Sequence, residues 1–65
     1  MTMTKHDLKQ LRKALGLSQE KLARALGWTT SSVSKKESGA RPISEADANL
    51  VRLTVKELRE GRKNA

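Results

Sequence analysis

The sequence contains no cysteine, phenylalanine or tyrosine, and it has one proline, one tryptophan and one histidine among its 65 residues. The lack of cysteine excludes disulfides and thiolate metal sites, which commonly stabilise very small domains. No apolar run exceeds a few positions, so we expect neither a transmembrane span nor a signal peptide. The single small core must therefore be held by helix packing, or by association with a second copy of the chain.

The sequence also lacks the residue groupings that catalysis or metal binding requires. His6 is the only histidine and lies in the first turn of an expected helix, with no serine, cysteine or acid arranged to work with it. No HExxH motif, glycine-rich phosphate loop or EF-hand pattern occurs. The acids are scattered on helix faces that also carry bases, which is typical of solvated ion pairs. We expect a protein that is not an enzyme and that has no metal and no cofactor.

Positive charge, by contrast, is abundant. The formal net charge is +7 and the sequence pI is about 10.4. A field of this sign attracts polyanions, of which nucleic acid is the commonest. A solubilising surface is one alternative, and an anionic membrane is another, although a membrane-active helix needs a broader apolar face than these segments offer. Residues 1–24 contain six Lys/Arg and two acids, whereas residues 44–60 contain three Lys/Arg and four acids. We therefore expect the basic surface in the first two-thirds of the chain.

One local pattern occurs four times and predicts where helices begin. A hydroxyl residue suited to an N-cap follows an apolar residue and precedes another by four positions, as in a hydrophobic staple: Met3-Thr4 with Leu8, Leu17-Ser18 with Leu22, Trp28-Thr29 with Val33, and Ile43-Ser44 with Ala48. Thr4 with Asp7 and Ser44 with Asp47 also approximate capping boxes. The helices are expected to end near four glycines, Gly16, Gly27, Gly39 and Gly61. The prediction is an all-α chain with helices over 5–15, 19–26, 30–37 and 45–60.

The last predicted helix has two apolar stripes. One contains Ala46, Leu50 and Leu53, and we expect it to lie on the core of the first three helices. The other is expected to form a homodimer interface: Ala48, Val51, Val55 and Leu58. Alternatively, 54–60 forms a separate short helix that buries the second stripe internally, and the β-branched Thr54 and Val55 are compatible with a break there.

Residues 19–37 form the outline of a helix-turn-helix. Two short helices are joined by a turn that contains Gly27, which is the spacing of that motif. The first helix has inward positions at Leu22, Ala23 and Leu26, and the second has Val33. The outward positions of the second helix carry hydrogen-bonding side chains, which suits a helix that reads DNA. Trp28, at the entrance to this helix, is interpreted as a core residue because of its staple position; stacking on DNA is the alternative.

The run LRKALGLSQEKLARALGWTTSSVSKKESGARP closely resembles the helix-turn-helix of the Cro and phage-repressor type, over about residues 5–45. The resemblance implies a compact four- to five-helix lambda-repressor-like domain over 1–61, with a long C-terminal dimerisation helix and a flexible basic tail at 62–65. It also implies a regulator of bacterial or phage origin. The absence of cysteine fits a cytoplasmic location, and because the sequence contains no effector domain we expect no small-molecule effector. Such a regulator represses transcription, including that of its own gene, by binding an inverted-repeat operator as a homodimer. An antitoxin module that binds both DNA and a toxin protein is the alternative.

The resemblance also implies roles for individual residues. The base-reading positions on helix 30–37 are Thr30, Ser31 and Lys35, with Ser34 as a fourth candidate. Phosphate contacts are expected from Gln19, Thr29, Ser32 and Arg41 by resemblance, and from Lys21, Arg24 and Lys36 by charge. Arg12 and Glu37 match a structural ion pair that ties the first helix to the end of the third.

Lys36 departs from the family pattern, because most relatives have an apolar or aromatic residue there. Its side chain must either extend along the surface to reach water, or add a phosphate contact. Lys35 is the strongest base reader by chemistry, because its ammonium can donate to O6 and N7 of guanine. We therefore expect a G near the middle of each half-site, with two reading helices about 34 Å apart in the dimer.

Overall fold

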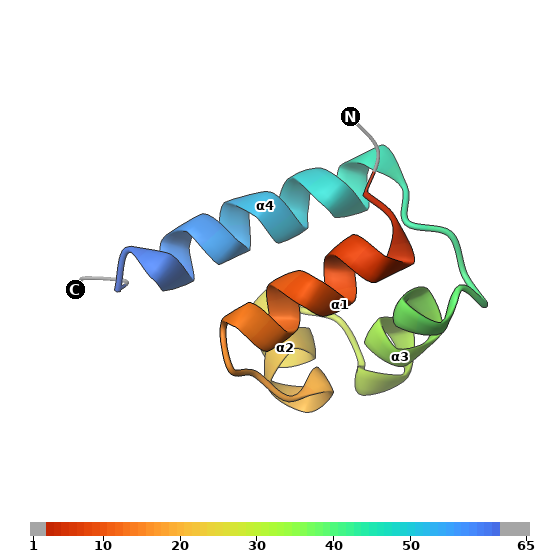
Figure 1. The fold of residues 1–65 in the computed structure, drawn as a ribbon, viewed down its shortest axis with the longest axis horizontal. Coiled ribbons are helices and arrows are strands. Elements are labelled where there is room, and N and C mark those ends of the chain that lie inside the picture. The colour runs from red at the N-terminus through yellow and green to blue at the C-terminus, as the bar shows by residue number, and fades with distance from the viewer. Residues whose placement is uncertain (1–2, 62–65) are drawn as a thin grey trace.

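The computed structural model of the protein describes residues 3–61. Those residues form four helices and no strand: α1 Lys5–Ala14, α2 Gln19–Leu26, α3 Thr30–Ser38 and α4 Glu45–Arg59 (Figure 1). The all-α prediction is confirmed, and the predicted helix bounds differ from the observed ones by at most one residue. The tail predicted at 62–65 lies outside the described residues.

All four helices begin at the predicted hydroxyl caps. In each case the cap side chain accepts a hydrogen bond from the backbone N–H three residues later, at Thr4, Ser18, Thr29 and Ser44. Both capping boxes are complete, because the carboxylates of Asp7 and Asp47 accept from the backbone N–H of the cap residue at 3.1 and 3.2 Å. A cap of this kind contributes about 1 kcal/mol. The helix starts are therefore marked by contacts within a few residues of each cap.

The turn between α2 and α3 is a Schellman-type helix end. Gly27 adopts a left-handed conformation with φ 78°, and the Trp28 N–H donates to the Ala23 carbonyl at 2.8 Å. A Cβ at Gly27 would meet nothing within 4 Å, so glycine is needed there for its backbone conformation rather than for space. The turn brings Trp28 against the core and lets α3 begin after Thr29.

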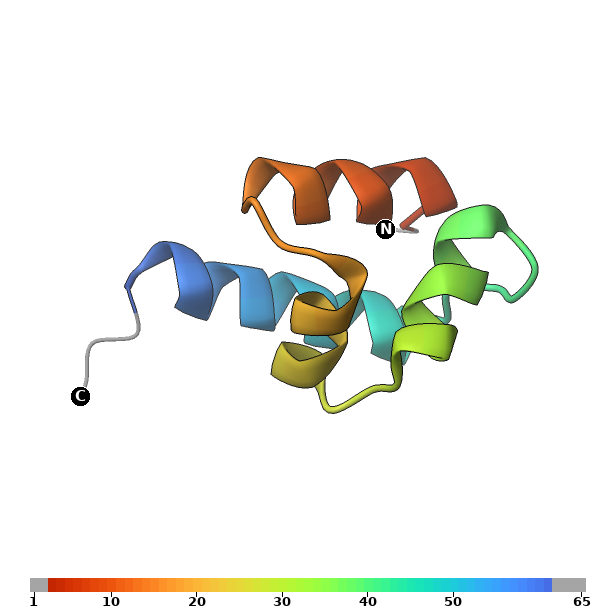
Figure 2. The same ribbon diagram turned by 90° about the horizontal axis from the view of Figure 1, so that it is seen from below.

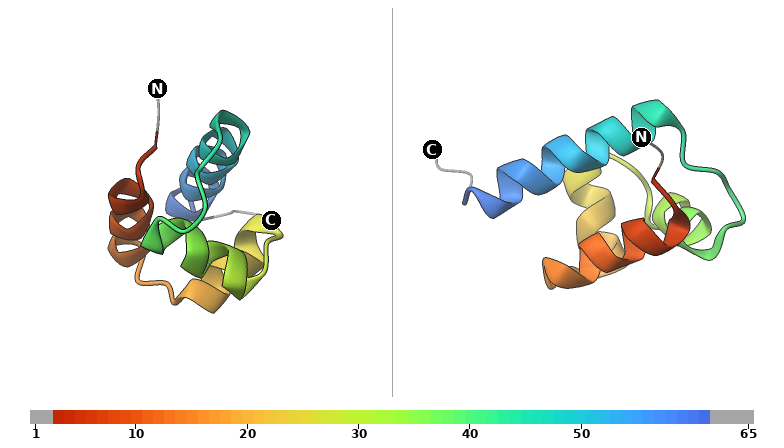
Figure 3. Two further views of the ribbon diagram at one scale, coloured as in Figure 1. Left: turned by 90° about the vertical axis from the view of Figure 1, so that its right-hand side faces the viewer. Right: turned by 45° about the horizontal axis from the view of Figure 1, so that its top comes forward.

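The helices enclose one core. α1 and α4 run in the same general direction, and α2 crosses the gap between them (Figure 3, right). α2 packs chiefly on α3, α1 packs on α3, and α2 also contacts α4 (Figure 2). The buried apolar side chains are Met3, Leu8, Leu22, Ala23, Leu26, Val33, Ala48, Val51 and Val55. Trp28 is partly buried against this cluster, which agrees with its interpretation as a core residue.

α4 is one uninterrupted helix, so the alternative of a separate helix at 54–60 is wrong. The assignment of its two stripes is also wrong. The predicted dimer residues Ala48, Val51 and Val55 are buried within the monomer, with Val51 0% exposed, and Leu58 is half-buried. The stripe expected on the core faces solvent instead, because Leu50 is 37% exposed, Leu53 is 56% exposed and Ala46 is also exposed.

A physical reason for this reversal lies in the side chains themselves. Ala48 is small and Val51 and Val55 are short, so α4 can approach α2 more closely on this face than leucines would allow. The staple at the start of the helix agrees, because Ile43 packs against the same cluster that buries Ala48. Once Ala48 faces inward, the helical repeat also turns Val51 and Val55 inward.

Candidate nucleic-acid interface

α3 presents a polar face to solvent. Thr30, Ser31, Ser34 and Lys35 are all exposed, while Val33 on the opposite side is fully buried. Its sequence is rich in serine and threonine, which have low helix propensity. The helix therefore depends on its Thr29 cap and on contacts with the rest of the molecule. The four predicted base-reading residues thus share one accessible face of a helix whose other face is anchored in the core.

A buried charge network fixes the end of α3. Arg12 of α1 donates through Nε to Glu37 Oε2 at 2.7 Å and through a terminal nitrogen to Glu37 Oε1 at 3.1 Å. The Glu37 side chain is 4% exposed. Another Arg12 nitrogen donates to the Leu17 carbonyl at 2.9 Å. This bidentate pair is the ion pair implied by the family resemblance, and it joins α1, the following turn and α3.

Gln19, the first residue of α2, also belongs to this network. Its side-chain Nε2 donates to Glu37 Oε1 at 3.1 Å, so both carboxylate oxygens of Glu37 are used within the protein. The contact connects the start of α2 directly to the end of α3. Gln19 is partly buried, and its expected phosphate contact stays a prediction.

Lys36 occupies a position that the phosphate prediction did not anticipate. Its side chain is 9% exposed, its ammonium lies 3.6 Å from Asp47 Oδ2 in α4, and it lies 5.1 Å from the centre of the Trp28 ring. An ammonium held between a carboxylate and an indole face gains from both. The structure therefore contradicts a phosphate contact from Lys36. The side chain connects α3 to α4 instead of extending to solvent.

The other predicted phosphate residues differ in how accessible they are. Lys21, Arg24 and Arg41 are exposed, although Arg24 forms a surface ion pair with Glu20 at 3.2 Å. Such a pair contributes little and yields readily to a competing anion. The Thr29 hydroxyl already accepts from the Ser32 N–H at 3.1 Å, as a cap. The Thr29 hydroxyl can still donate one hydrogen bond. It lies at the N-terminal end of α3, together with the partly buried Ser32 hydroxyl.

Lys5 is a basic residue near this interface that sequence reasoning did not select. Its side chain lies over Gly39, where a Cβ atom added to the glycine would come within 3.0 Å of Lys5 Cδ and 3.1 Å of Nζ. Gly39 has φ 89°, so the backbone conformation favours glycine, whereas the flexible Lys5 side chain could move away from an added Cβ. Lys5 and Arg41 line the same small pocket of about 190 Å³ beside the end of α3. Only charge marked Lys5 in the sequence, because no local pattern shows that the start of α1 meets this loop.

Other kinds of site find no support in the part of the chain that the structure describes. Residues 3–61 contain no group of three or more His, Cys, Asp or Glu side chains placed to hold a metal ion. Within the same residues, no helix has the length and apolar character needed to cross a membrane.

Comparison with known families agrees with this geometry. A family model described as a helix-turn-helix domain matches residues 6–54, which are 49 of the 65 residues. The matched range includes all of α2 and α3 and ends within α4. No curated protein and no solved structure matches the chain.

Proposed function

This chain belongs to the helix-turn-helix domain family, and we propose that it is a sequence-specific regulator of transcription that inserts α3 into the major groove of double-stranded DNA. The observation that carries the proposal is the construction of α3. Its exposed face offers four hydrogen-bonding side chains, while Val33 and Glu37 anchor its other side in the protein. A helix of this size fits the major groove, where each base pair presents a distinct pattern of donors and acceptors.

Within that proposal, Lys35 is the main base reader. Its ammonium can donate to guanine O6 and N7, whereas the hydroxyls of Ser31 and Ser34 can donate to or accept from several bases. The Thr30 methyl group suits contact with a thymine methyl. Because small hydroxyl residues discriminate weakly on their own, sequence-dependent DNA shape supplies part of the specificity.

Phosphate contacts hold α3 in register without reading sequence. We assign them to exposed or partly exposed groups around the helix-turn-helix, namely Lys5, Gln19, Lys21, Arg24, Thr29, Ser32 and Arg41. Gln19 also lies at the start of α2, where free backbone N–H groups and the helix dipole favour an anion. Lys36 is not assigned a phosphate, because its ammonium is held between Asp47 and Trp28.

The regulator is proposed to act as a homodimer on an inverted repeat. The exposed stripe of α4, formed by Ala46, Leu50 and Leu53, supports this step because its members recur at i, i+4 and i+7 on one helix flank. Neighbouring exposed apolar side chains of this kind mark interaction surfaces. A two-fold axis at this stripe would place two copies of α3 on successive major grooves, about 34 Å apart. Occupancy of an operator that overlaps a promoter blocks polymerase, so the proposed outcome is repression, including that of its own gene.

The test is DNase footprinting on the DNA upstream of its own gene, combined with affinity measurements over a series of salt concentrations. We expect a protected inverted repeat, with binding at least about 10³-fold tighter than to a random duplex at physiological salt. Affinity should fall with log salt at a slope of about −0.9 per phosphate contacted. Equal affinity for the upstream DNA and the random duplex would contradict sequence-specific regulation.

A further inference from the structure

A groove lies between α1 and the C-terminal half of α4. Its volume is about 420 Å³, and it is lined by Leu11 from α1 and by Arg52, Val55, Lys56, Arg59 and Glu60 from α4 and its cap. The C-terminal half of α4 lies at the end of the molecule away from α3 (Figures 1 and 2). Nothing in the proposed DNA contacts uses these residues. The groove is therefore a second surface that remains accessible when α3 is engaged.

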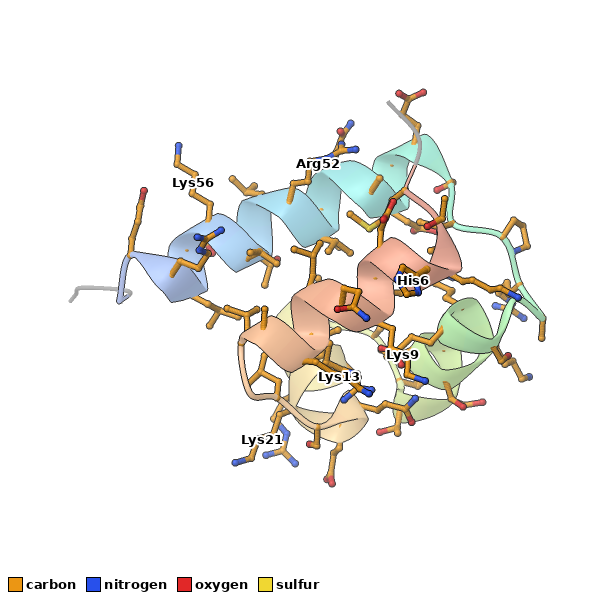
Figure 4. All side chains as sticks on the ribbon, viewed as in Figure 1. His6, Lys9, Lys13, Lys21, Arg52 and Lys56 are labelled. Carbon is orange, nitrogen blue, oxygen red and sulfur yellow. The ribbon has the colours of Figure 1, made fainter. Side chains whose placement is uncertain are left out.

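The groove concentrates positive charge in a segment that is otherwise acidic. Residues 44–60 contain three bases and four acids. All three bases line the groove, whereas Glu60 is the only one of the four acids that does. Arg52 and Lys56 project from the same side of α4, one turn apart (Figure 4). Arg52 is oriented by a hydrogen bond from its guanidinium to Asn49 Oδ1 at 3.3 Å.

The remaining lining residues are apolar and connect with the core. Val55 is 6% exposed and belongs to the core cluster, and Leu11 is partly buried against it. The groove thus has an apolar base and a cationic rim. A nucleic-acid backbone has no apolar side chains to pack against the apolar base of the groove. A simple anion is too small to contact the whole cationic rim. The complementary ligand is amphipathic and negatively charged.

We propose that this groove binds an acidic amphipathic helix of another protein, which is distinct from the DNA-binding role and does not depend on it. Apolar side chains at helical spacing would pack on Leu11 and Val55, in the helix-in-groove mode. Carboxylates on the flank of that helix would pair with Arg52, Lys56 and Arg59, and arginine can do so bidentately.

A second copy of this chain does not fit this groove as well. Its own net charge is +7, so a symmetric contact here would bring two cationic rims together, which charge repulsion opposes. The apolar stripe Ala46, Leu50 and Leu53 is not part of the groove lining. A homodimer through that stripe leaves the groove open, and the acidic partner would be held on the side of the regulator that faces away from DNA.

The test uses the full chain and a designed peptide of about 15 residues, or four helical turns. The peptide carries leucines at i, i+3, i+4 and i+7 spacing, with glutamates on both flanks. Amide chemical shifts should change saturably at Leu11, Val55, Lys56 and Arg59. The double variant Arg52→Glu/Lys56→Glu should weaken peptide binding about tenfold or more. Circular dichroism and thermal melting of the variant confirm that it stays folded.

Two controls isolate the groove from general electrostatics. Lys9→Glu/Lys13→Glu changes the net charge by the same amount at two exposed positions of α1 that do not line the groove, and it should change peptide affinity by less than about twofold. A peptide of the same composition in scrambled order keeps its charge but loses its apolar stripe, and should bind much more weakly. Equal binding of the scrambled peptide, or equal loss in both charge variants, would overturn the proposal. So would a larger loss of random-duplex affinity for Arg52→Glu/Lys56→Glu than for the control pair, which would make the groove a nucleic-acid surface.

Discussion

α3 and α4 lie on the same core, but they differ in which residues they bury. α3 buries charged residues, which are usually exposed, whereas α4 exposes leucines, which are usually buried. α3 buries two charged residues, Lys36 and Glu37, and exposes a row of hydroxyls. α4 buries alanine and valines and leaves Leu50 and Leu53 in solvent. Burying a charge costs desolvation free energy that only a well-placed partner offsets, and several apolar side chains exposed along one helix flank form a patch that can pack against another surface. In α3 the buried charges pair with residues of α1 and α4, and in α4 the exposed leucines belong to the stripe that we propose as the dimer surface.

The two helices therefore differ in the balance of contacts that position them. α3 is anchored in the core by Val33 and is also held by the ion pairs of Glu37 and Lys36. α4 is held mainly by the apolar packing of Ala48, Val51 and Val55, together with the ion pair from Asp47 to Lys36. Directional contacts set an orientation more sharply than apolar packing does. A sharply set orientation suits the role proposed for α3, which requires its side chains to reach base edges within hydrogen-bonding distance.

The largest expected effect tests the two faces of α4 against each other. Val51→Asp would place a carboxylate in the core, and we expect the chain to lose its cooperative fold, because an unpaired buried charge exceeds the stability of a domain this small. Leu53→Asp on the exposed flank should leave helicity unchanged. Circular dichroism with thermal melting separates these outcomes.

The same Leu53→Asp variant tests the dimer. We expect sedimentation equilibrium to give a dimer for the parent chain and a monomer for the variant, and we expect the variant to bind the operator more weakly. A folded Val51→Asp variant of reduced mass would instead restore the original assignment of the dimer stripe.

The next largest effect concerns the network that holds α3. Glu37→Ala removes the partner of the partly buried Arg12 and of Gln19, and it should lower the free energy of unfolding by about 3–5 kcal/mol. Glu20→Ala is the matched control. Glu20 pairs with Arg24, and its side chain is 68% exposed. The free energy of unfolding should therefore change by no more than about 0.5 kcal/mol. Urea unfolding of both variants measures the difference, and similar losses would show that burial of the Arg12 pair is unimportant.

A smaller and more specific effect is expected on the reading face. Lys35→Ala should weaken operator binding by about 1–3 kcal/mol and relax the preference at one base pair. Stability should hardly change, because Lys35 is exposed. Competition among operator duplexes with each base pair varied gives the measurement. An equal loss of affinity on all sequences would make Lys35 a phosphate contact.

The smallest effect is expected at Lys36. Lys36→Met removes the ammonium that lies over Trp28 but keeps an unbranched side chain only one heavy atom shorter, and it leaves Asp47 bonded to the Ser44 N–H. The free energy of unfolding should change by no more than about 1.5 kcal/mol. The salt dependence of DNA binding should be the same as in the parent chain, since no phosphate contact is lost. A salt slope reduced by about one unit would show that Lys36 reaches a phosphate after all.

The helices could be predicted because their signals are local. Each hydroxyl cap and its flanking apolar pair lie within a few residues, and Gly27 and Gly39 mark where α2 and α3 end. The ion pair of Arg12 and Glu37 could be anticipated only by resemblance, because its members are 25 residues apart. Helical spacing alone predicts that Ser31, Ser34 and Lys35 face outward, whereas Thr30 and the base-reading roles could be anticipated only by resemblance.

The orientation of α4 could not be predicted from its periodicity. Periodicity separates the two apolar stripes but does not say which one faces the core, and the larger leucines suggested the wrong one. The staple of Ile43 with Ala48 carried the correct signal, because it turns Ala48 inward. Lys36 and Lys5 were beyond local reasoning for the same cause, since their neighbours Asp47 and Gly39 belong to distant parts of the chain.

The Asp47 carboxylate, which contacts both α3 and the start of α4, bears on which operator spacings the proposed dimer accepts. Asp47 Oδ2 accepts from the Ser44 N–H at the start of α4 and also lies 3.6 Å from the Lys36 ammonium of α3. If two chains pair through α4, this oxygen helps set the angle between each reading helix and the dimer axis. We expect Asp47→Ala to leave each half-site preference intact but to broaden the range of half-site separations that the dimer accepts. An operator with one base pair inserted at its centre would then be bound almost as well as the original.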